Sequence, residues 1–270
     1  MSWRDVAYKN VHDASRSRTV WIVSGLLAVL FVGYALVHGF LGEASFAAFA
    51  VGIENIVGLV LPALGILLGY RSISDDREDG SLLLALSFPH SRGDLIVGTL
   101  VGRAVVLVVP TVATLAVAGV VGAVQYGTDG ILWYPWFLFA TALYGMAFVG
   151  VGVGLSMSTT SDRRITFGAV GGYLLLAVLW RGLVSFAIGF IHRFDPSIGM
   201  PDWGLLLQLI GPAEAYSRLV HAGFDVGGVD QYVGVSVPPY VDWWGALLVL
   251  VAWIAVPVAL GFRRFRAADL

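Results

Sequence analysis

The sequence contains no cysteine, and only one of its 16 basic residues, Lys9, is a lysine. Without cysteine, the chain has neither a disulfide framework nor a thiolate nucleophile or metal ligand. Lys9 lies outside any GxxxxGK[ST] pattern, so the chain cannot itself be a P-loop ATPase. The HExxH and GxSxG motifs are missing as well, and no two histidines have the spacing of metal ligands on a helix. The sequence therefore predicts a protein that is not an enzyme and has no metal or cofactor site.

Charge is also scarce. Charged residues make up 13% of the chain and hydrophobic residues 58%, whereas a soluble domain carries roughly 25% charged residues. A hydrocarbon core ~30 Å thick needs about 20 apolar helical residues per crossing. Six stretches meet this requirement: Val20–Phe40, Gly52–Tyr70, Leu95–Val124, Trp133–Met157, Ile165–Ile191 and Trp243–Phe262. We therefore expect an all-α integral membrane protein, a single domain over residues 1–270 with six transmembrane helices.

The first stretch is too long for the apolar region of a cleavable signal peptide, and no small-x-small cleavage site follows it before the second. We therefore expect it to be retained as a membrane span.

The basic residues predict the orientation. Twelve of the 16 precede the first stretch, follow the sixth, or lie between stretches two and three or four and five. Only Arg193 and Arg218 fall on the opposite side. Basic loops stay in the cytoplasm, so we expect a multi-pass plasma-membrane protein with both termini cytoplasmic. An aromatic belt on the opposite side fits this orientation; its members are Tyr126, Trp133, Tyr134, Trp136, Trp243 and Trp244.

The N-terminal segment, residues 1–19, has the pattern of an amphipathic helix over Ser2–Arg18. Ser2 and Asp5 have the spacing of a capping box. We interpret the segment as a helix on the cytoplasmic lipid surface. The alternative is a polar leader that only carries positive-inside residues.

Residues 71–94 form the most polar segment. An acidic cluster (Asp75, Asp76, Glu78 and Asp79) precedes Gly80 and a short apolar run, Leu82–Leu86. This run is too short to span a bilayer but could form a helix across the cytoplasmic face. Such a segment could dock a soluble partner, or it could be no more than a solvated surface.

The connection over residues 192–242 is too apolar for a plain loop. Trp203–Ile210 is too short to cross the membrane, Gly211 and Pro212 would end it, and Ala213–Ala222 could form a second short helix. Because irregular backbone cannot be exposed to lipid, we expect re-entrant helices that dip into the outer leaflet before the sixth span.

Two ionisable residues lie deep within predicted spans. Glu54 and Arg181 are each 16 residues from the cytoplasmic end of their stretch, or roughly 24 Å along a helix. Charges in lipid are usually paired or hydrated. We expect either an intramembrane pair between them or separate extension of each to the outer interface.

Glycines recur along several stretches at a spacing that lets helices approach closely. They are Gly65, Gly69, Gly98, Gly102, Gly145, Gly150, Gly152 and Gly154.

The segment Tyr70–Arg103 resembles the first cytoplasmic loop and the following span of type-2 ATP-binding-cassette (ABC) permeases. The positions that fit the family pattern are Tyr70, Ile73, Gly80, Leu82, Leu86, Ser87, Pro89, Ser91, Arg92, Gly98, Gly102 and Arg103. Asp76 replaces the family's Glu, Ser81 its Thr, and Thr99 its usual Lys. Gly211–Tyr216 also resembles the family's P-x-x-A-Y stretch, and the resemblance extends over nearly the whole chain.

The resemblance implies a function and partners. Such permeases pair with a second copy or a related chain, carry two separate ATPase subunits, and move a substrate across the lipid bilayer; no nucleic acid is involved. The cytoplasmic loop would be the helix that couples to the ATPase, with candidate residues Asp75, Asp76, Glu78, Gly80, Leu82, Leu86, Pro89 and Arg92. The leading hypothesis is therefore the membrane subunit of an ABC exporter. The alternatives are a non-transporting scaffold or maturation factor associated with an ABC-type ATPase, and a membrane-embedded enzyme.

Overall fold

The computed structural model describes residues 2–40, 45–72, 92–159, 161–194, 200–224 and 238–267. Within these ranges every regular element is a helix. Six helical segments are long and apolar enough to span a membrane: Arg18–Phe40, Phe46–Gly69, Gly93–Tyr126, Ile131–Ser158, Asp162–Ile191 and Trp243–Arg266. Each overlaps one of the predicted stretches, so the expected helical class with six candidate spans is confirmed.

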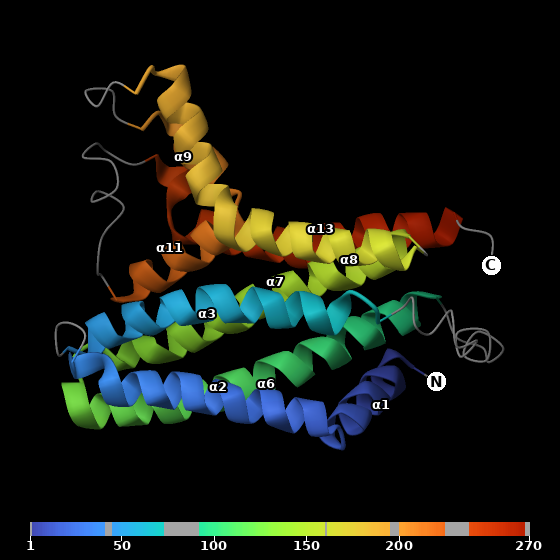
Figure 1. Cartoon of the computed structure of the whole chain (residues 1–270), viewed down its shortest axis with the longest axis horizontal. Coiled ribbons are helices and arrows are strands. Elements are labelled where there is room, and N and C mark those ends of the chain that lie inside the picture. The colour runs from blue at the N-terminus through green and yellow to red at the C-terminus, as the bar shows by residue number, and fades with distance from the viewer. Residues whose placement is uncertain are drawn as a thin grey trace.

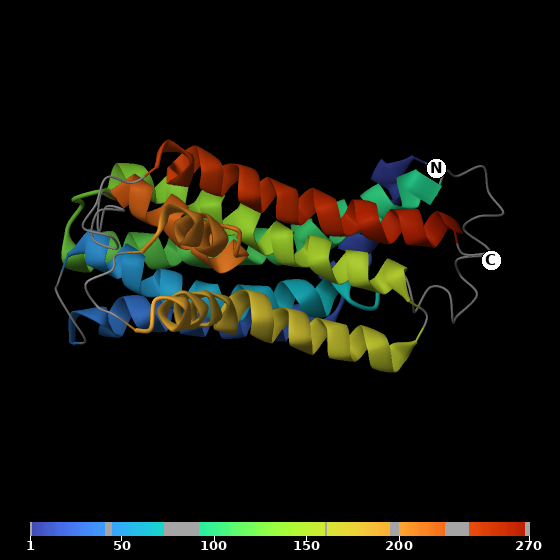
Figure 2. The same cartoon turned by 90° about the horizontal axis from the view of Figure 1, so that it is seen from above.

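The long helices run along one axis of the molecule, and both termini lie at the same end (Figures 1 and 2). We call this the terminal end and the opposite one the far end. The α-helices are α1 (Trp3–Ser15), α2 (Arg18–Val37), α3 (Phe46–Gly69), α6 (Arg92–Tyr126), α7 (Tyr134–Ser158), α8 (Asp162–Tyr173), α9 (Trp180–Ile191), α10 (Asp202–Leu209), α11 (Pro212–Phe224) and α13 (Trp243–Ala267). The shorter helices are η1 (His38–Phe40), η2 (Ile131–Trp133), η3 (Leu174–Leu179) and η4 (Pro239–Val241).

Helix α7 forms the centre of the bundle. In its most apolar 18-residue window 72% of residues are buried, compared with 17–39% in the other five candidate spans. A helix that is apolar on all sides is suited to this position. Its main neighbours are α13 and α3.

Glycines bring α7 close to both neighbours. A Cβ atom added to Gly152 would lie 2.8 Å from the carbonyl oxygen of Ile66 on α3. On the side that faces α13, a Cβ atom on Gly150 would lie 2.8 Å from the Ile254 oxygen, and one on Gly154 would lie 2.5 Å from the Pro257 oxygen. The glycine pattern in the sequence therefore corresponds to contacts between the backbones of neighbouring helices.

The fifth candidate span is not the uniform helix that its apolar sequence predicts. It begins as α8, changes to a π-helix at η3, and continues as α9. A π-helical turn inserts an extra residue into the helical repeat and often bends the helix. Figure 1 shows α8 running along the bundle and α9 turning away from it at the far end.

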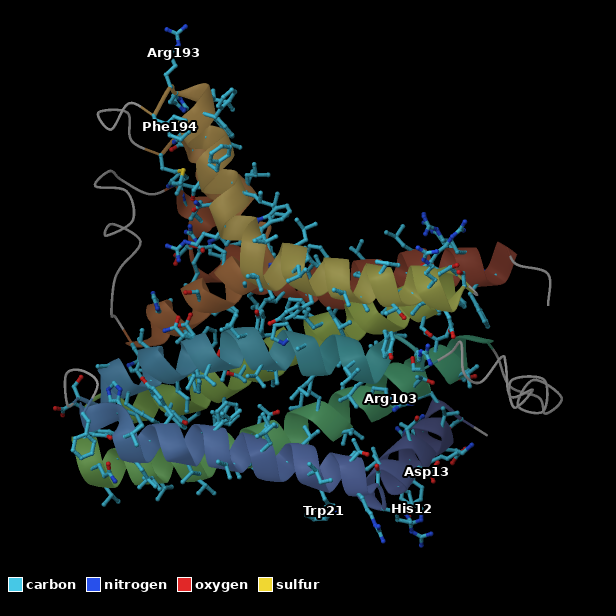
Figure 3. All side chains as sticks on the ribbon, in the orientation of Figure 1. His12, Asp13, Trp21, Arg103, Arg193 and Phe194 are labelled. Carbon is cyan, nitrogen blue, oxygen red and sulfur yellow. The ribbon has the colours of Figure 1, made fainter. Side chains whose placement is uncertain are left out.

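The N-terminal helix and its capping box are both confirmed. The backbone N–H of Arg4 donates to Ser2 Oγ at 3.3 Å, and the backbone N–H of Ser2 donates to Asp5 Oδ2 at 2.6 Å. His12 and Asp13, on the polar face of α1, point away from the bundle (Figure 3).

Helix α1 packs mainly against the beginning of α6. Its docking surface there contains the two glycines of the predicted family motif. A Cβ atom added to Gly98 would lie 2.5 Å from the Val6 Cβ, and one added to Gly102 would lie 2.6 Å from the Asn10 Cβ. This pair of glycines therefore lets the two backbones come into close contact.

The Gly154→Ala substitution is expected to lower the free energy of unfolding by about 1–3 kcal/mol, the usual cost of overpacking. The new methyl group would overlap the backbone of Pro257. Gly171→Ala on α8 is the matched control, because a Cβ atom there has no neighbour within 4 Å. Thermal unfolding of the purified protein in detergent measures both. A Gly154→Ala protein as stable as the control would contradict the close packing of α7 on α13.

Candidate functional site

Two short helices occupy the far end of the bundle. The expected helices over Trp203–Ile210 and Ala213–Ala222 are present as α10 and α11. Gly211 separates them, as the sequence indicates. Helix α11 packs against α3, α7 and α13, and α10 packs against α9. The short helices thus connect the bundle to the part of the fifth span that turns away.

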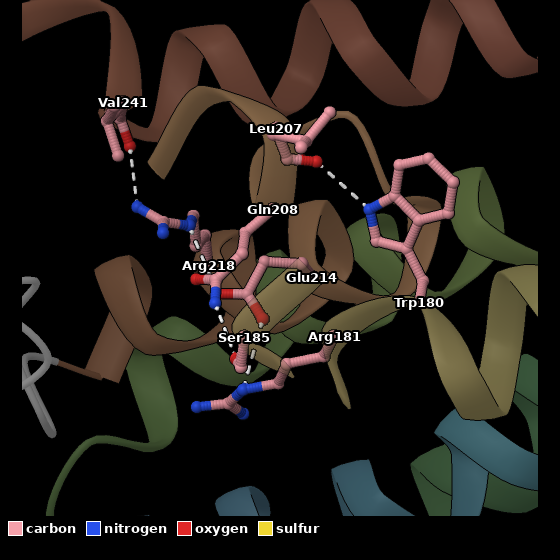
Figure 4. A network of polar contacts seen from close by, with 8 residues as sticks. All are labelled: Trp180, Arg181, Ser185, Leu207, Gln208, Glu214, Arg218 and Val241. Carbon is pink, nitrogen blue, oxygen red and sulfur yellow. Dashed lines mark hydrogen bonds and ion pairs between the residues drawn. The ribbon is translucent and has the colours of Figure 1, made fainter. Parts of the chain in front are cut away.

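Glu214 on α11 is the centre of a buried polar cluster (Figure 4). Its Oε1 lies 3.3 Å from Nε of Arg218, and its Oε2 lies 3.7 Å from Nε of Arg181 on α9. The side chains of Glu214 and Arg218 are 4% and 7% exposed, whereas that of Arg181 is 53% exposed. Arg218 Nη1 also donates to the carbonyl oxygen of Val241, at 3.4 Å. The cluster therefore links α11 to α9 and to the short helix before α13.

Glu54 contacts a residue that neither of the two alternatives from the sequence included. Its Oε2 lies 3.1 Å from Nε2 of His221 on α11, while Arg181 is paired with Glu214. The reason is that α11 packs against both α3 and the fifth span, so its side chains supply partners to both. Glu54 and Arg181 thus each contact α11, Glu54 through the His221 ring and Arg181 through an ion pair with Glu214. We call these five residues (Glu54, Arg181, Glu214, Arg218 and His221) the α11 network.

Three tryptophans from three candidate spans hold the short helices in place. Trp180 Nε1 donates to the Leu207 carbonyl at 3.0 Å, Trp253 Nε1 to the Ile210 carbonyl at 2.8 Å, and Trp136 Nε1 to the Leu219 carbonyl at 2.6 Å. Leu207 and Ile210 lie at the C-terminal end of α10, where carbonyl groups lack partners within the helix. Each indole therefore combines apolar packing with a hydrogen bond.

The rings of these tryptophans also fit beside glycines. Gly211 lies against the Trp180 ring, and a Cβ atom added to Gly223 would lie 2.5 Å from Cδ1 of Trp136. A larger residue at either position would collide with an indole. The Gly211–Pro212 break thus both separates the two short helices and makes room for Trp180.

Aromatic and hydroxyl side chains of α7 and α11 also pack together inside the bundle. The rings of Tyr144 and Tyr216 stack with their centroids 4.4 Å apart, and the hydroxyls of Tyr216 and Thr141 lie 2.9 Å apart. Burial raises the pKa of Tyr216 well above its ordinary value, and the nearby Glu54 carboxylate raises it further. Tyr216 therefore remains a neutral hydrogen-bonding group.

The predicted coupling residues fall mostly outside the described residues. Asp75, Asp76, Glu78, Gly80, Leu82, Leu86 and Pro89 lie in residues 73–91, which the structure does not describe. Arg92 is the first residue of α6. The two helices that flank this segment, α3 and α6, meet it at the terminal end (Figure 1).

At the same end, an ion pair joins the second and fifth candidate spans. Nη2 of Arg71, which follows α3, lies 3.2 Å from Oδ2 of Asp162 at the start of α8. Sequence reasoning missed this pair. It also missed Glu214 and Arg218, although their i,i+4 spacing on a predicted helix is typical of an ion pair. Among the described residues, no group of three His, Cys, Asp or Glu residues could hold a metal ion.

Glu214→Gln is expected to reduce the free energy of unfolding by about 3–5 kcal/mol, the typical cost of breaking a buried ion pair. It would leave the buried Arg218 without the Glu214 carboxylate. Arg181→Gln in the same cluster should cost about 0–1 kcal/mol, because the Arg181 side chain is half exposed. Thermal unfolding in detergent compares the two, and equal losses would contradict the assigned geometry.

Comparisons with known proteins assign the chain to a family. The family described as ABC-2 family transporter protein matches residues 4–270. The chain is similar to the probable ABC transporter permease protein NosY of Stutzerimonas stutzeri, with 30% identity over 279 residues that cover 97% of each chain. It is also similar to the protein of the same name from Pseudomonas aeruginosa, with 28% identity over 274 residues that cover 97% of this chain and 96% of the other. The chain belongs to the ABC-2 family of transporter proteins.

Proposed function

We propose that this chain is the permease subunit of an ABC exporter and that residues 1–270 form its single membrane domain. The observation that carries the proposal is the family match over residues 4–270, together with the names of the two similar proteins. The chain contains no phosphate-binding loop of its own. ATP hydrolysis is therefore the task of separate ATPase subunits, and the permease pairs with a second copy or a related permease chain.

The proposed contact with the ATPase is the segment around Asp75, Asp76 and Glu78, with Gly80, Leu82, Leu86, Pro89 and Arg92 completing it. The arrangement of the flanking helices supports this assignment. The C-terminal end of α3 and the N-terminal end of α6, which border the segment, both lie at the terminal end. Helix α1 is docked on the beginning of α6 through Gly98 and Gly102. A displacement of the segment would therefore move α6 and α1 together.

In the proposed orientation the chain lies in the plasma membrane with its terminal end in the cytoplasm. The support for this orientation is the basic residues: Arg4, Lys9 and Arg16 belong to α1 or its cap, and Arg263, Arg264 and Arg266 belong to the end of α13. In this orientation α1 lies at the cytoplasmic lipid surface.

The far end then faces outward, and α10 and α11 are the re-entrant helices of the outer leaflet. Substrate that leaves the bundle on this side has to pass helices held by three indole hydrogen bonds and by the α11 network. We infer that these contacts form the outer gate. The ATPase can open it only if it binds the open and closed permease with different free energies.

The orientation can be tested with single cysteines, because the natural chain has none. Ser74→Cys, in the proposed coupling segment, should be protected from a membrane-impermeant maleimide in intact cells and labelled after permeabilisation. Thr128→Cys, between α6 and α7, is the matched position on the other side and should be labelled in intact cells. The reverse labelling pattern would refute the orientation.

Asp76→Lys is expected to uncouple the ATPase from transport without affecting membrane insertion, because it reverses a charge at the proposed contact. Loss of 1–3 kcal/mol of coupling free energy would reduce transport about 5- to 150-fold. The measurement is export by the permease with the ATPase recovered in a pull-down, together with ATP hydrolysis and membrane abundance. Asp129→Lys at the far end is the control, and wild-type transport by the Asp76→Lys protein would contradict the assignment.

A further inference from the structure

A groove of about 240 Å³ lies between α3 and α8, in the half of the bundle nearer the terminal end. Ala63, Ile66 and Tyr70 line it from α3, and Thr166, Ala169 and Tyr173 line it from α8. Each set recurs every three or four residues, so each comes from one face of its helix. The groove therefore extends about 10 Å along the two helices.

The walls of this groove are suited to hydrocarbon. Ile66 and Ala169 are buried at its floor, while Ala63 and Val170 are exposed along its edges. Most of the lining is apolar, and the hydroxyl-bearing residues are Tyr70, Thr166 and Tyr173. Such a surface can hold a single flexible alkyl chain, which gains about 0.8 kcal/mol per buried methylene group in water. Within lipid, the fit of the chain to the groove determines how long it stays.

The end of the groove nearer the termini is charged. Arg71 directly follows Tyr70 after the end of α3, and Asp162 and Arg163 are one turn before Thr166 at the start of α8, so all three lie next to the lining residues at this end. Arg71 pairs with Asp162 at 3.2 Å, and its guanidinium lies 5.6 Å from the ring centroid of Tyr70. The guanidinium of Arg163 lies 5.5 Å from the ring centroid of Phe167. Of these three described residues, two are basic and one is acidic.

We propose that the groove binds an anionic phospholipid of the inner leaflet, with one acyl chain between α3 and α8 and the phosphate at Arg163 and Arg71. The combination identifies the ligand class. A free phosphate would make no contact with the apolar walls, and a neutral hydrocarbon would make no ion pair with the basic residues. Basic pockets between membrane helices on the cytoplasmic side bind anionic head groups in this way. The leaflet assignment rests on the orientation given under Proposed function.

The position of the lipid connects it to the transport cycle. Helix α3 leads directly into residues 73–91, and α8 begins the span that contains the π-helix. An acyl chain in the groove would set the separation of these two spans beside the Arg71–Asp162 pair. The lipid is therefore a resident ligand that biases the conformation of the permease, rather than cargo.

The test is native mass spectrometry of the purified full chain with phosphatidylglycerol or phosphatidylcholine of identical acyl chains. We expect tighter binding of phosphatidylglycerol. Arg163→Gln should weaken it about fivefold, the contribution of one basic residue near an anionic head group. Ala63→Phe, at an exposed position, should fill the groove and weaken binding of the same lipid without changing any charge. Arg193→Gln is the matched control, because Arg193 lies at the tip of α9 at the far end (Figure 3).

Phosphatidylglycerol with a photoreactive acyl chain supplies a second readout, in which the crosslinks should be concentrated on peptides containing Tyr70 and Tyr173. Equal binding of the two lipids, evenly distributed crosslinks, or wild-type affinity in both Arg163→Gln and Ala63→Phe would overturn the proposal. If Ala63→Phe fails to fold, the exposed Arg163→Gln variant and the crosslinks still decide. The binding assay in detergent depends on neither the ATPase nor the orientation. A negative result would therefore overturn the lipid site and leave the proposed function untouched.

A final arm separates a resident lipid from a transported one. Proteoliposomes that contain the permease and its ATPase carry labelled phosphatidylglycerol in one leaflet. Label that stays in this leaflet during ATP hydrolysis supports the resident lipid. ATP-dependent transfer to the other leaflet would identify the groove as a substrate site and overturn the regulatory role.

Discussion

Close contact between helix backbones is the constraint on which this fold depends. Lipid provides little hydrophobic driving force for helix association, so packing between helices has to supply the stability. In this chain, α7 meets that demand on two sides, with Gly152 against the backbone of α3 and Gly150 and Gly154 against that of α13. With α3 and α13 fixed to α7, the remaining helices can bend or tilt around a rigid centre.

The α11 network contains charged side chains in apolar surroundings, where a charge has to be offset by a partner of opposite sign. Glu214 and Arg218 are almost completely buried, and their opposite charges lie 3.3 Å apart. Removing one member of such a pair is costly, because it leaves an uncompensated charge in the interior. Together with the three indole hydrogen bonds, the network defines how α10 and α11 sit against three separate spans. Any motion of α10 and α11 therefore has to break these polar contacts and form others.

Sequence patterns predicted the elements of this structure well and their partners poorly. The six candidate spans, the capping box of α1 and both short helices followed from composition, spacing and turn residues, which act locally. The π-helix did not, because its apolar residues have the same composition as those of an α-helix. Glu54 and Arg181 were recognised as ionisable residues within predicted spans, but their partners depend on where α11 packs. The coupling role of all eight residues stays a prediction, and only Arg92 of them lies within the described residues.

The docking of α1 on α6 has a consequence for synthesis of the protein. Gly98 and Gly102 follow Val6 and Asn10 by about 90 residues, and two candidate spans intervene. At ~5–20 residues per second, α1 leaves the ribosome roughly 5–20 s before its docking surface exists. During this interval its apolar face has only the bilayer surface or a chaperone to cover it. The assembly of the terminal end therefore waits for insertion of the third candidate span.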